Sequence, residues 1–204
     1  MFKFFRLEVW QLSKDALILA WVLLVGAAGV GIFMLVADVR EERKPAPVAY
    51  AQTVQVYFDN AFQNMGALDC RAVFPVSRGL PAEAEPLRAS LEALFAGPTA
   101  EEAAMGYRSW FSSGTASLLR GVGVREGVAY VDLNDPRLLI PGASSSCGSQ
   151  AFLAQIEVTV LQQPGIRRVV FAMEGDPQPF YEWLQRGCDV TNNYCDRAPF
   201  AGIG

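Results

Sequence analysis

The sequence predicts an N-terminal transmembrane helix followed by one compact α+β domain, in which a mixed sheet of about four to five strands packs with two main helices. The first observation is an uncharged apolar run at residues 16–37. The second is the succession of strand and helix signals across residues 54–176, and the third is a set of four cysteines that all follow the apolar run. We therefore divide the chain into five parts: a cytoplasmic tail at residues 1–14, a transmembrane helix at residues 15–37, a tether at residues 38–53, a domain at residues 54–176 and a C-terminal tail at residues 177–204.

The apolar run has the length that a membrane span requires. Residues 16–37 contain no charged or amide side chain, and at about 1.5 Å per residue they cover roughly the thickness of a hydrocarbon core. The run is longer than the apolar region of a signal peptide, so we expect a retained helix. Residues 1–14 mix aromatic and basic side chains, which fits either an interfacial helix or a short disordered tail. Residues 38–53 combine charged residues with Pro45-Ala46-Pro47, as in an extended tether.

Cysteine usage indicates the compartment. Cys70, Cys147, Cys188 and Cys195 form an even set without C-x-x-C spacing, and the chain has no histidine to complete a zinc site. Two disulfides in an oxidising compartment are the simplest interpretation, with four reduced thiols in a cytoplasmic domain as the alternative. Cys188 and Cys195 suit a small closed turn, although pairing of Cys70 or Cys147 with the tail stays open. We therefore expect the N-terminus inside the cell and the domain outside.

The first half of the domain begins with two strands and a helix. Residues 54–58 alternate as in a strand, and residues 70–76 read as a buried strand at an edge or bulge, because Pro75 cannot donate to a ladder. Residues 81–96 predict a helix that Gly97-Pro98 ends. Its apolar stripe consists of Leu87, Leu91, Leu94 and Phe95. Thr99 and Glu102 have capping-box spacing, which predicts a short further helix.

The second half predicts a hairpin, a helix and a strand. Residues 116–124 and 128–133 are strand-like around a turn at residues 125–127. A loop at residues 134–149 precedes an amphipathic helix at residues 150–163, whose core side consists of Phe152, Leu153, Ile156, Val160 and Leu161. Residues 167–173 are a strongly apolar strand, and residues 181–184 are short helix or irregular structure.

Composition excludes several functions. Without histidine the chain cannot form Ser-His or Cys-His nucleophile pairs. The net charge of −4 and the lack of a basic stripe in the domain argue against nucleic acid as a partner. We expect no catalytic residue, no metal ion and no cofactor. Chemistry based on two carboxylates survives this argument, although solvated or capping roles are the favoured interpretation of the acids. The available acids are Asp132, Asp135, Glu157, Glu174 and Asp176.

Several of these segments together resemble the GerMN domain, a module named after the sporulation and spore-germination protein GerM. The segments that carry the resemblance are residues 70–78, 91–102, 106–109, 127–133, 146–147, 155–160 and 169–175, within an overall extent of about 53–176. This chain departs from the family in having one copy of the module, a transmembrane anchor in place of a lipid-modified cysteine, and a C-terminal tail outside the resemblance. A sporulation role therefore does not transfer.

The resemblance implies an extracytoplasmic α+β module of bacterial envelope proteins that binds or assembles and has no established enzymatic activity. The family fold is similar to ring-building modules of secretion machinery, which implies self-association or docking. In this family, cysteines at the positions of Cys70 and Cys147 can occur together, which supports their pairing.

We therefore expect a single-pass protein of the bacterial cytoplasmic membrane, with an envelope protein or a cell-wall ligand as its partner. The alternatives are a carboxylate-based enzyme acting on cell-wall glycan and an adaptor subunit of a transport or secretion complex. The candidate binding residues are Arg78, Tyr107, Arg108 and Trp110, which stand at expected element ends. The competing interpretation of these residues is a salt-bridged Arg78 and packed aromatic rings.

Overall fold

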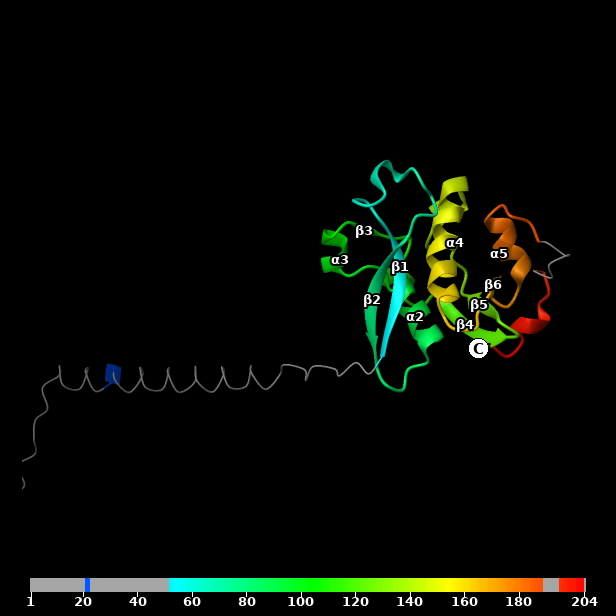
Figure 1. The fold of residues 1–204 in the computed structure, drawn as a ribbon, viewed down its shortest axis with the longest axis horizontal. Helices are drawn as coiled ribbons and strands as arrows, with labels where there is room; N and C mark the ends of the chain where they lie inside the picture. Colours follow the sequence, from blue (N-terminus) through cyan, green and yellow to red (C-terminus); the bar gives the residue numbers. More distant parts are fainter. Residues whose placement is uncertain (1–20, 23–51, 189–194, 204) are drawn as a thin grey trace, which may run out of the picture. The chain divides into compact units, whose positions relative to one another are not determined.

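The computed structural model describes residues 21–22, 52–188 and 195–203 (Figure 1). The chain divides into two compact units, residues 1–48 and 49–204, and the second contains the folded domain. The expectations for the cytoplasmic tail, for nearly all of the transmembrane helix and for most of the tether lie outside the described residues. Within the described residues, no helix is long and apolar enough to cross a bilayer.

The first sheet contains three antiparallel strands. β1 (Gln52–Asn60) lies between β2 (Phe74–Leu80) and β3 (Tyr107–Arg108). Alternate β1 residues, Val54, Val56 and Phe58, are buried, as the predicted alternation requires. β2 is an edge strand, so the interpretation of Pro75 is confirmed. However, this strand begins at Phe74, and Cys70 lies in the turn before it, because residues 69–72 close a turn from the Ala72 N–H to the Asp69 carbonyl.

The second sheet joins a hairpin to a parallel strand. β4 (Leu119–Arg125) and β5 (Val128–Leu133) are antiparallel, and β5 pairs in parallel with β6 (Arg168–Met173). Glu126 and Gly127 both have positive φ, 53° and 77°, as the tight turn of a two-residue hairpin requires. The predicted hairpin is confirmed, although β4 starts at Leu119 because residues 115–118 form a turn.

The expected single mixed sheet is wrong, because the strands form two separate sheets. The physical reason lies on the side of β1 away from β2, where β3 pairs only with Asp59 and Asn60, and where side chains from α4 (Ser146–Leu161) and the residue after it bind the rest of the strand. The Tyr57 N–H donates to Thr159 Oγ1 at 3.1 Å, and Gln162 Nε2 donates to the Gln55 carbonyl. Backbone groups that could pair with another strand are therefore satisfied by a helix and the residue after it.

The residues in and just before the first turn of each helix explain where it begins. α2 (Pro86–Phe95) starts with a proline in its first turn, later than the expected residue 81. α3 (Ala100–Ala104) has the predicted capping box of Thr99 and Glu102, which is confirmed. α4 begins at Ser146 because the Ser145 hydroxyl accepts the Gly148 N–H at 3.1 Å. Cys147 therefore lies in the first turn of a helix, not in the expected loop.

One core joins the two sheets through α4. Phe152, Ile156 and Val160 are fully buried, whereas Leu161, which we expected on the core side, is 41% exposed. The α2 stripe is buried as predicted. A chain of aromatic contacts runs from Phe95 through Phe111 and Phe152 to Phe180 of α5 (Pro177–Trp183), which forms the helix expected near residues 181–184.

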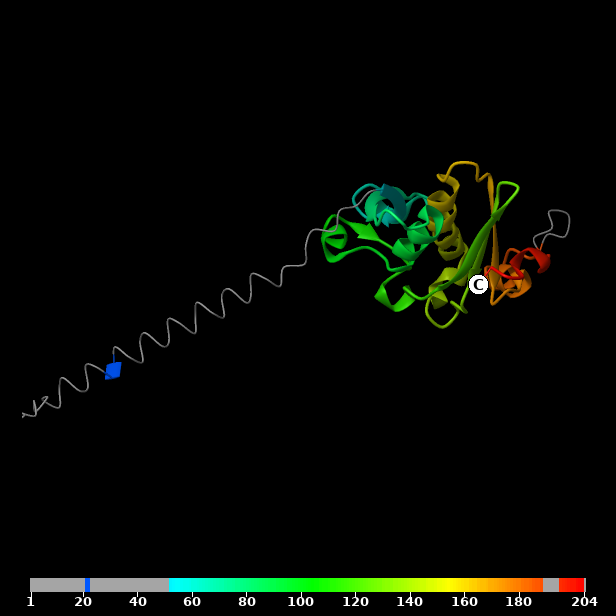
Figure 2. The same cartoon turned by 90° about the horizontal axis from the view of Figure 1, so that it is seen from below.

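The C-terminal segment covers the other face of the second sheet. Figure 2 shows the red end of the chain across this sheet from the yellow helix α4. Phe200 and Ile203 pack against Val170 and Ala172, while the alternate β6 residues face the main core. The tail meets the backbone of β4 at Gly121, where a Cβ atom would lie 1.4 Å from the Ile203 carbonyl oxygen. Residues 195–203 are therefore part of the packed structure.

Gly121→Ala should loosen the C-terminal segment, because the new methyl group would overlap with the Ile203 carbonyl. We expect a loss of about 1–3 kcal/mol in the free energy of unfolding, which is the usual cost of overpacking. Urea unfolding measures this loss. Gly123→Ala is the matched control, because its Cβ would meet only Ile203 side-chain atoms at 3.5 Å or more. Equal stability of the two variants would contradict the proposed contact.

Candidate functional site

A cavity of about 340 Å³ lies beside the Cys70–Cys147 disulfide. Its walls come from the end of β1, the loop of residues 61–73, β3 with the two residues that follow it, and the first turns of α4. The lining residues are Asp59, Asn64, Ala67, Asp69, Cys70, Ala72, Val73, Arg108, Ser109, Trp110, Cys147, Ala151 and Gln155. The site thus forms where three segments distant in sequence meet.

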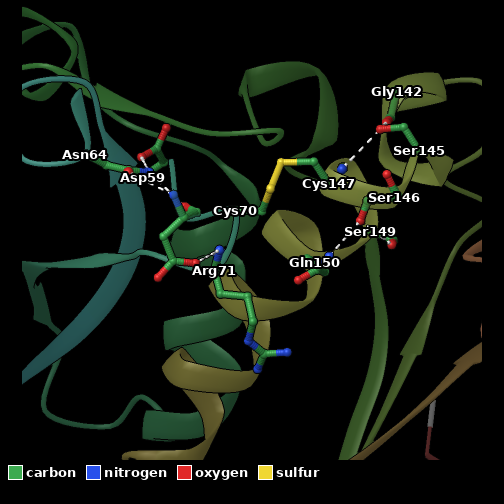
Figure 3. Close-up of a disulfide and its surroundings, with 12 residues drawn as sticks. Asp59, Asn64, Cys70, Arg71, Gly142, Ser145, Ser146, Cys147, Ser149 and Gln150 are labelled. Carbon is green, nitrogen blue, oxygen red and sulfur yellow. Dashed lines mark hydrogen bonds between the residues drawn. A yellow bond between two sulfur atoms is a disulfide. The ribbon is translucent and has the colours of Figure 1, made fainter. Parts of the chain in front are cut away.

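The disulfide ties the loop to the helix, as Figure 3 shows. Cys70 and Cys147 are 77 residues apart in sequence, and their Cα atoms are 5.3 Å apart. Cys188 and Cys195 form the second disulfide, so both expected pairings are confirmed and the described cysteines include no free thiol. The Cys70–Cys147 bridge fixes one wall of the cavity relative to α4.

A polar network lines one side of the cavity. Arg108 Nη2 lies 2.6 Å from Asp59 Oδ2, and Asn64 Nδ2 donates to Asp59 Oδ1 at 3.2 Å. Asn64 Nδ2 also donates to the Asp69 carbonyl at 2.9 Å, and the Asp69 carboxylate accepts the Arg71 N–H at 2.8 Å. These bonds join the end of β1 to β3 and to the loop, and Arg108 is held by Asp59, the residue directly opposite it on the adjacent strand β1.

Trp110 borders the cavity and is 36% exposed. Its six-membered ring lies against Gly142, where a Cβ atom would come within 2.8 Å of the ring. The neighbouring Ser109 donates its hydroxyl to Gln155 Oε1, and Gln155 Nε2 donates to the Ala151 carbonyl at 3.1 Å. The buried amide of Gln155 is therefore satisfied, and the segment that carries Trp110 is attached to α4.

Arg78 and Tyr107 serve other parts of the structure. The Arg78 guanidinium forms a two-point ion pair with the buried Glu102 and lies 5.9 Å from the centre of the Phe58 ring. The Tyr107 hydroxyl donates to the Pro75 carbonyl at 3.2 Å. Of the four candidate binding residues, the structure brings Arg108 and Trp110 together in the cavity and places the other two in contacts within the fold.

The pKa of Glu102 reflects its partners. Burial alone would raise the pKa of this carboxyl group. The hydrogen bonds from Arg78 and from the Thr99 N–H, together with the charge of Arg78, outweigh burial and lower the pKa. Glu102 therefore stays ionised and links α3 to β2.

Four of the five acids considered for catalysis are engaged by arginine side chains. Asp132 is buried, accepts the Gly175 N–H at 2.8 Å and pairs with Arg120. Asp135 pairs with Arg137, whose hydrogen bonds lower the pKa of this exposed carboxyl group. Both carboxylates are therefore engaged by an arginine.

Two of the other three acids lie close to Asp132, because Glu174 and Asp176 flank the Gly175 whose N–H Asp132 accepts, whereas Glu157 lies elsewhere. Burial raises the pKa of Glu157, which lies 3.4 Å from Arg71, and the charges of Arg71 and Arg186 oppose this effect. Asp176 caps α5 and pairs with Arg197, and Glu174 stands in the turn after β6. Glu157 and Glu174 line two different cavities of the described domain. Within the described residues, no group of three or more Cys, Asp or Glu side chains could hold a metal ion.

Sequence reasoning missed the loop that forms one wall of the cavity. Asp59, Asn64 and Asp69 are not among the expected binding residues. The same loop carries the exposed side chains of Phe62, Met65 and Leu68. Large apolar residues without helical or strand periodicity, between two expected strands, were the available signal.

Stability should depend on pH through Glu102. Because its pKa is lower in the folded state than the roughly 4.3 of an unfolded glutamate, the Arg78–Glu102 pair contributes above about pH 4.3 and its contribution is lost as the pH falls through the folded pKa. Glu102→Gln should lower the free energy of unfolding by about 3 kcal/mol at pH 7 and by much less at pH 3. Urea unfolding at both pH values tests this.

Glu92→Gln, at an exposed surface pair, should change stability by less than about 0.5 kcal/mol. A pH-independent effect of Glu102→Gln would refute the assignment.

The two disulfides should differ in their contribution. In the chain-entropy model, the bridge across 77 residues stabilises by about 4 kcal/mol and the bridge across 7 residues by about 2 kcal/mol. We expect the double variant Cys70→Ser/Cys147→Ser to unfold at a lower urea concentration than Cys188→Ser/Cys195→Ser. The reverse order would show that loop length does not govern their contributions.

A family model described as Germane, sporulation and spore germination, matches residues 55–179 of the chain. The solved tandem GerMN domains of the sporulation protein GerM from Bacillus subtilis are similar, at 16% identity and a TM-score of 0.43, covering 65% of this chain and 42% of that chain. The first GerMN domain of the same protein is similar at 17% identity and a TM-score of 0.39, covering 61% of this chain and 84% of that chain.

This chain therefore spans less than half of the tandem-domain structure. No curated protein matches the sequence. The family match covers more than half of the chain and confirms the resemblance deduced from the sequence. The chain belongs to the Germane family of GerMN-like modules, whose description is sporulation and spore germination.

Proposed function

We propose that this protein is a membrane-anchored, extracytoplasmic binding or assembly module of the bacterial cell envelope. The apolar run at residues 16–37 would anchor it in the cytoplasmic membrane as a single span with its N-terminus inside. The tether at residues 38–53 would hold the domain away from the bilayer. An envelope protein or a cell-wall ligand would be the partner, with self-association as a further mode of assembly.

The Cys70–Cys147 disulfide is the observation that carries this proposal. It joins two segments that the fold brings together and it forms part of the wall of the cavity. Structural disulfides persist in oxidising compartments and are rare in the cytoplasm. A cytoplasmic domain would lose this bridge and with it the attachment of the cavity loop to α4. The second disulfide supports the same compartment.

The cavity supports binding more than catalysis. Its carboxylates are engaged in fixed contacts, since Asp59 pairs with Arg108 and Asp69 accepts a backbone N–H. The description of the family names a process, sporulation and spore germination, and does not name an enzymatic reaction. The alternative of a carboxylate-based enzyme acting on cell-wall glycan needs two facing carboxylates roughly 5–10 Å apart. The arrangement of the five candidate acids gives that alternative no support.

Alkylation and a topology reporter test the proposal on the full chain in bacterial membranes. A thiol-reactive reagent added without reductant should label no cysteine, and labelling of all four should require reduction and denaturation. Alkaline phosphatase fused after Gly204 should be active, because that enzyme needs an oxidising compartment. Four reactive thiols together with an inactive fusion would place the domain in the cytoplasm and overturn the proposal.

A further inference from the structure

We propose that the cavity beside the Cys70–Cys147 disulfide receives a large apolar side chain of a partner protein, from a segment that carries a lysine or arginine next to that side chain. The inference rests on the proposed function as an extracytoplasmic binding module and names the chemistry of its partner. The apolar wall, the exposed rim and the charge of the site carry it.

The wall of the cavity suits an apolar side chain. Ala72, Val73 and Ala151 line it together with the disulfide and the indole of Trp110. Apart from the indole N–H, these groups offer no strong hydrogen bond to a ligand, so water inside the cavity gains little from them. Replacing this water by an apolar side chain is favourable for the same reason that burial in a core is.

The loop that lines the cavity also presents apolar side chains to solvent, and we call this exposed group of side chains the rim. Phe62, Met65 and Leu68 are 68%, 74% and 91% exposed, and they lie on the loop that also lines the cavity. Exposed groups of this kind mark interaction surfaces, and aromatic residues, methionine and arginine are enriched at protein interfaces. A central pocket surrounded by such contacts is the usual form of an interface hot spot.

The first residues of the loop are held in place. Asn60 Oδ1 accepts the N–H groups of Phe62 and Gln63 at 2.9 and 3.2 Å, and the Asn64 N–H donates to the Asn60 carbonyl at 2.8 Å. The ring of Phe62 lies over Gly106, where a Cβ atom would come within 2.7 Å of it. The loop therefore needs little further ordering to bind a partner, which lowers the entropic cost of association.

The charges at the rim favour a basic neighbour on the partner. Asp59 is neutralised by Arg108, whereas Asp69 forms no salt bridge within the described part of the chain. One carboxylate therefore stands uncompensated beside the apolar opening. A lysine or arginine next to the inserted side chain would complement this charge.

A glycan fits the cavity less well. Sugar hydroxyls bind planar polar side chains, but both carboxylate oxygens of Asp59 and both polar atoms of the Gln155 amide already have partners within the protein, which leaves Asp69 and Arg108 as the planar groups with spare hydrogen-bonding capacity. A glycan would also leave the apolar rim without a role. Binding of a glycan is therefore an outcome that the experiment must be able to detect.

The test uses the full chain in lipid nanodiscs, labelled with 5-fluorotryptophan, with the Trp110 signal assigned from Trp110→Phe. The probes are the capped dipeptides acetyl-Leu-Lys-amide, acetyl-Ser-Lys-amide and acetyl-Leu-Glu-amide, and the sugar chitotriose. Acetyl-Leu-Lys-amide should shift the Trp110 fluorine resonance with a dissociation constant on the order of millimolar, as expected for so small a ligand. The serine probe should bind at least about tenfold more weakly, because its side chain buries almost no apolar surface.

Three variants separate the contributions of the cavity space and of the Asp69 charge to probe binding, with a control outside the cavity. Ala151→Leu should fill the cavity and abolish the shift, and a spectrum that is otherwise unchanged shows that the variant folds. Asp69→Asn, which can still accept the Arg71 N–H, should remove the preference for lysine over glutamate in the second probe position. Leu161→Ser, at an exposed apolar residue on the same helix but outside the cavity, should leave every titration unchanged.

A shift of the Trp110 signal by chitotriose and not by the dipeptides would overturn the inference in favour of a glycan site. The absence of any shift, or equal binding of the leucine and serine probes, would overturn it as well. The topology experiment is independent of these titrations. A domain found outside the cytoplasm with an unresponsive cavity would refute this inference and leave the proposed function standing.

Discussion

The packing of α4 between the two sheets is the constraint on which the rest of the structure depends. Phe152, Ile156 and Val160 are buried in the core that both sheets share, so the helix has little free circumference. Thr159 also satisfies the backbone of β1, which keeps the sheets separate. α4 also lies in the connection between β5 and the parallel strand β6, the kind of crossover that parallel strands require.

The cavity is a consequence of this packing at the N-terminal end of α4. The helix begins at the Ser145 cap, and within its first turn Cys147 reaches back to the loop before β2. The buried Gln155 binds Ser109 and so attaches the segment after β3 to the helix. Each polar group that the helix brings into the interior thus finds a partner, and the remaining space is bordered by small apolar side chains and Trp110.

Local signals predicted much of the fold. The alternation of β1, the hairpin turn at Glu126-Gly127, the capping box of Thr99 and the edge position of Pro75 depend on nearby residues, and the structure confirms them. The errors concern Cys70 and Cys147, placed in a strand and a loop, and the single sheet. These depended on which distant segments pair. Of the residues that line the cavity, Arg108 and Trp110 were expected as binding residues, whereas Asp59 and the loop opposite them were not.

The sequence by itself determined the kind of protein: an apolar run of membrane length, an even set of cysteines, no histidine, and motifs that identify a GerMN-like module. These depend on composition and on spacing along the chain. Only the tertiary structure decided that a helix covers one side of β1 and that Phe200 and Ile203 cover the second sheet. It also decided that Arg78 pairs with Glu102, whereas Arg108 lines a cavity. The physical reason is that burial and ion pairing are properties of contacts between distant residues, which local periodicity does not encode.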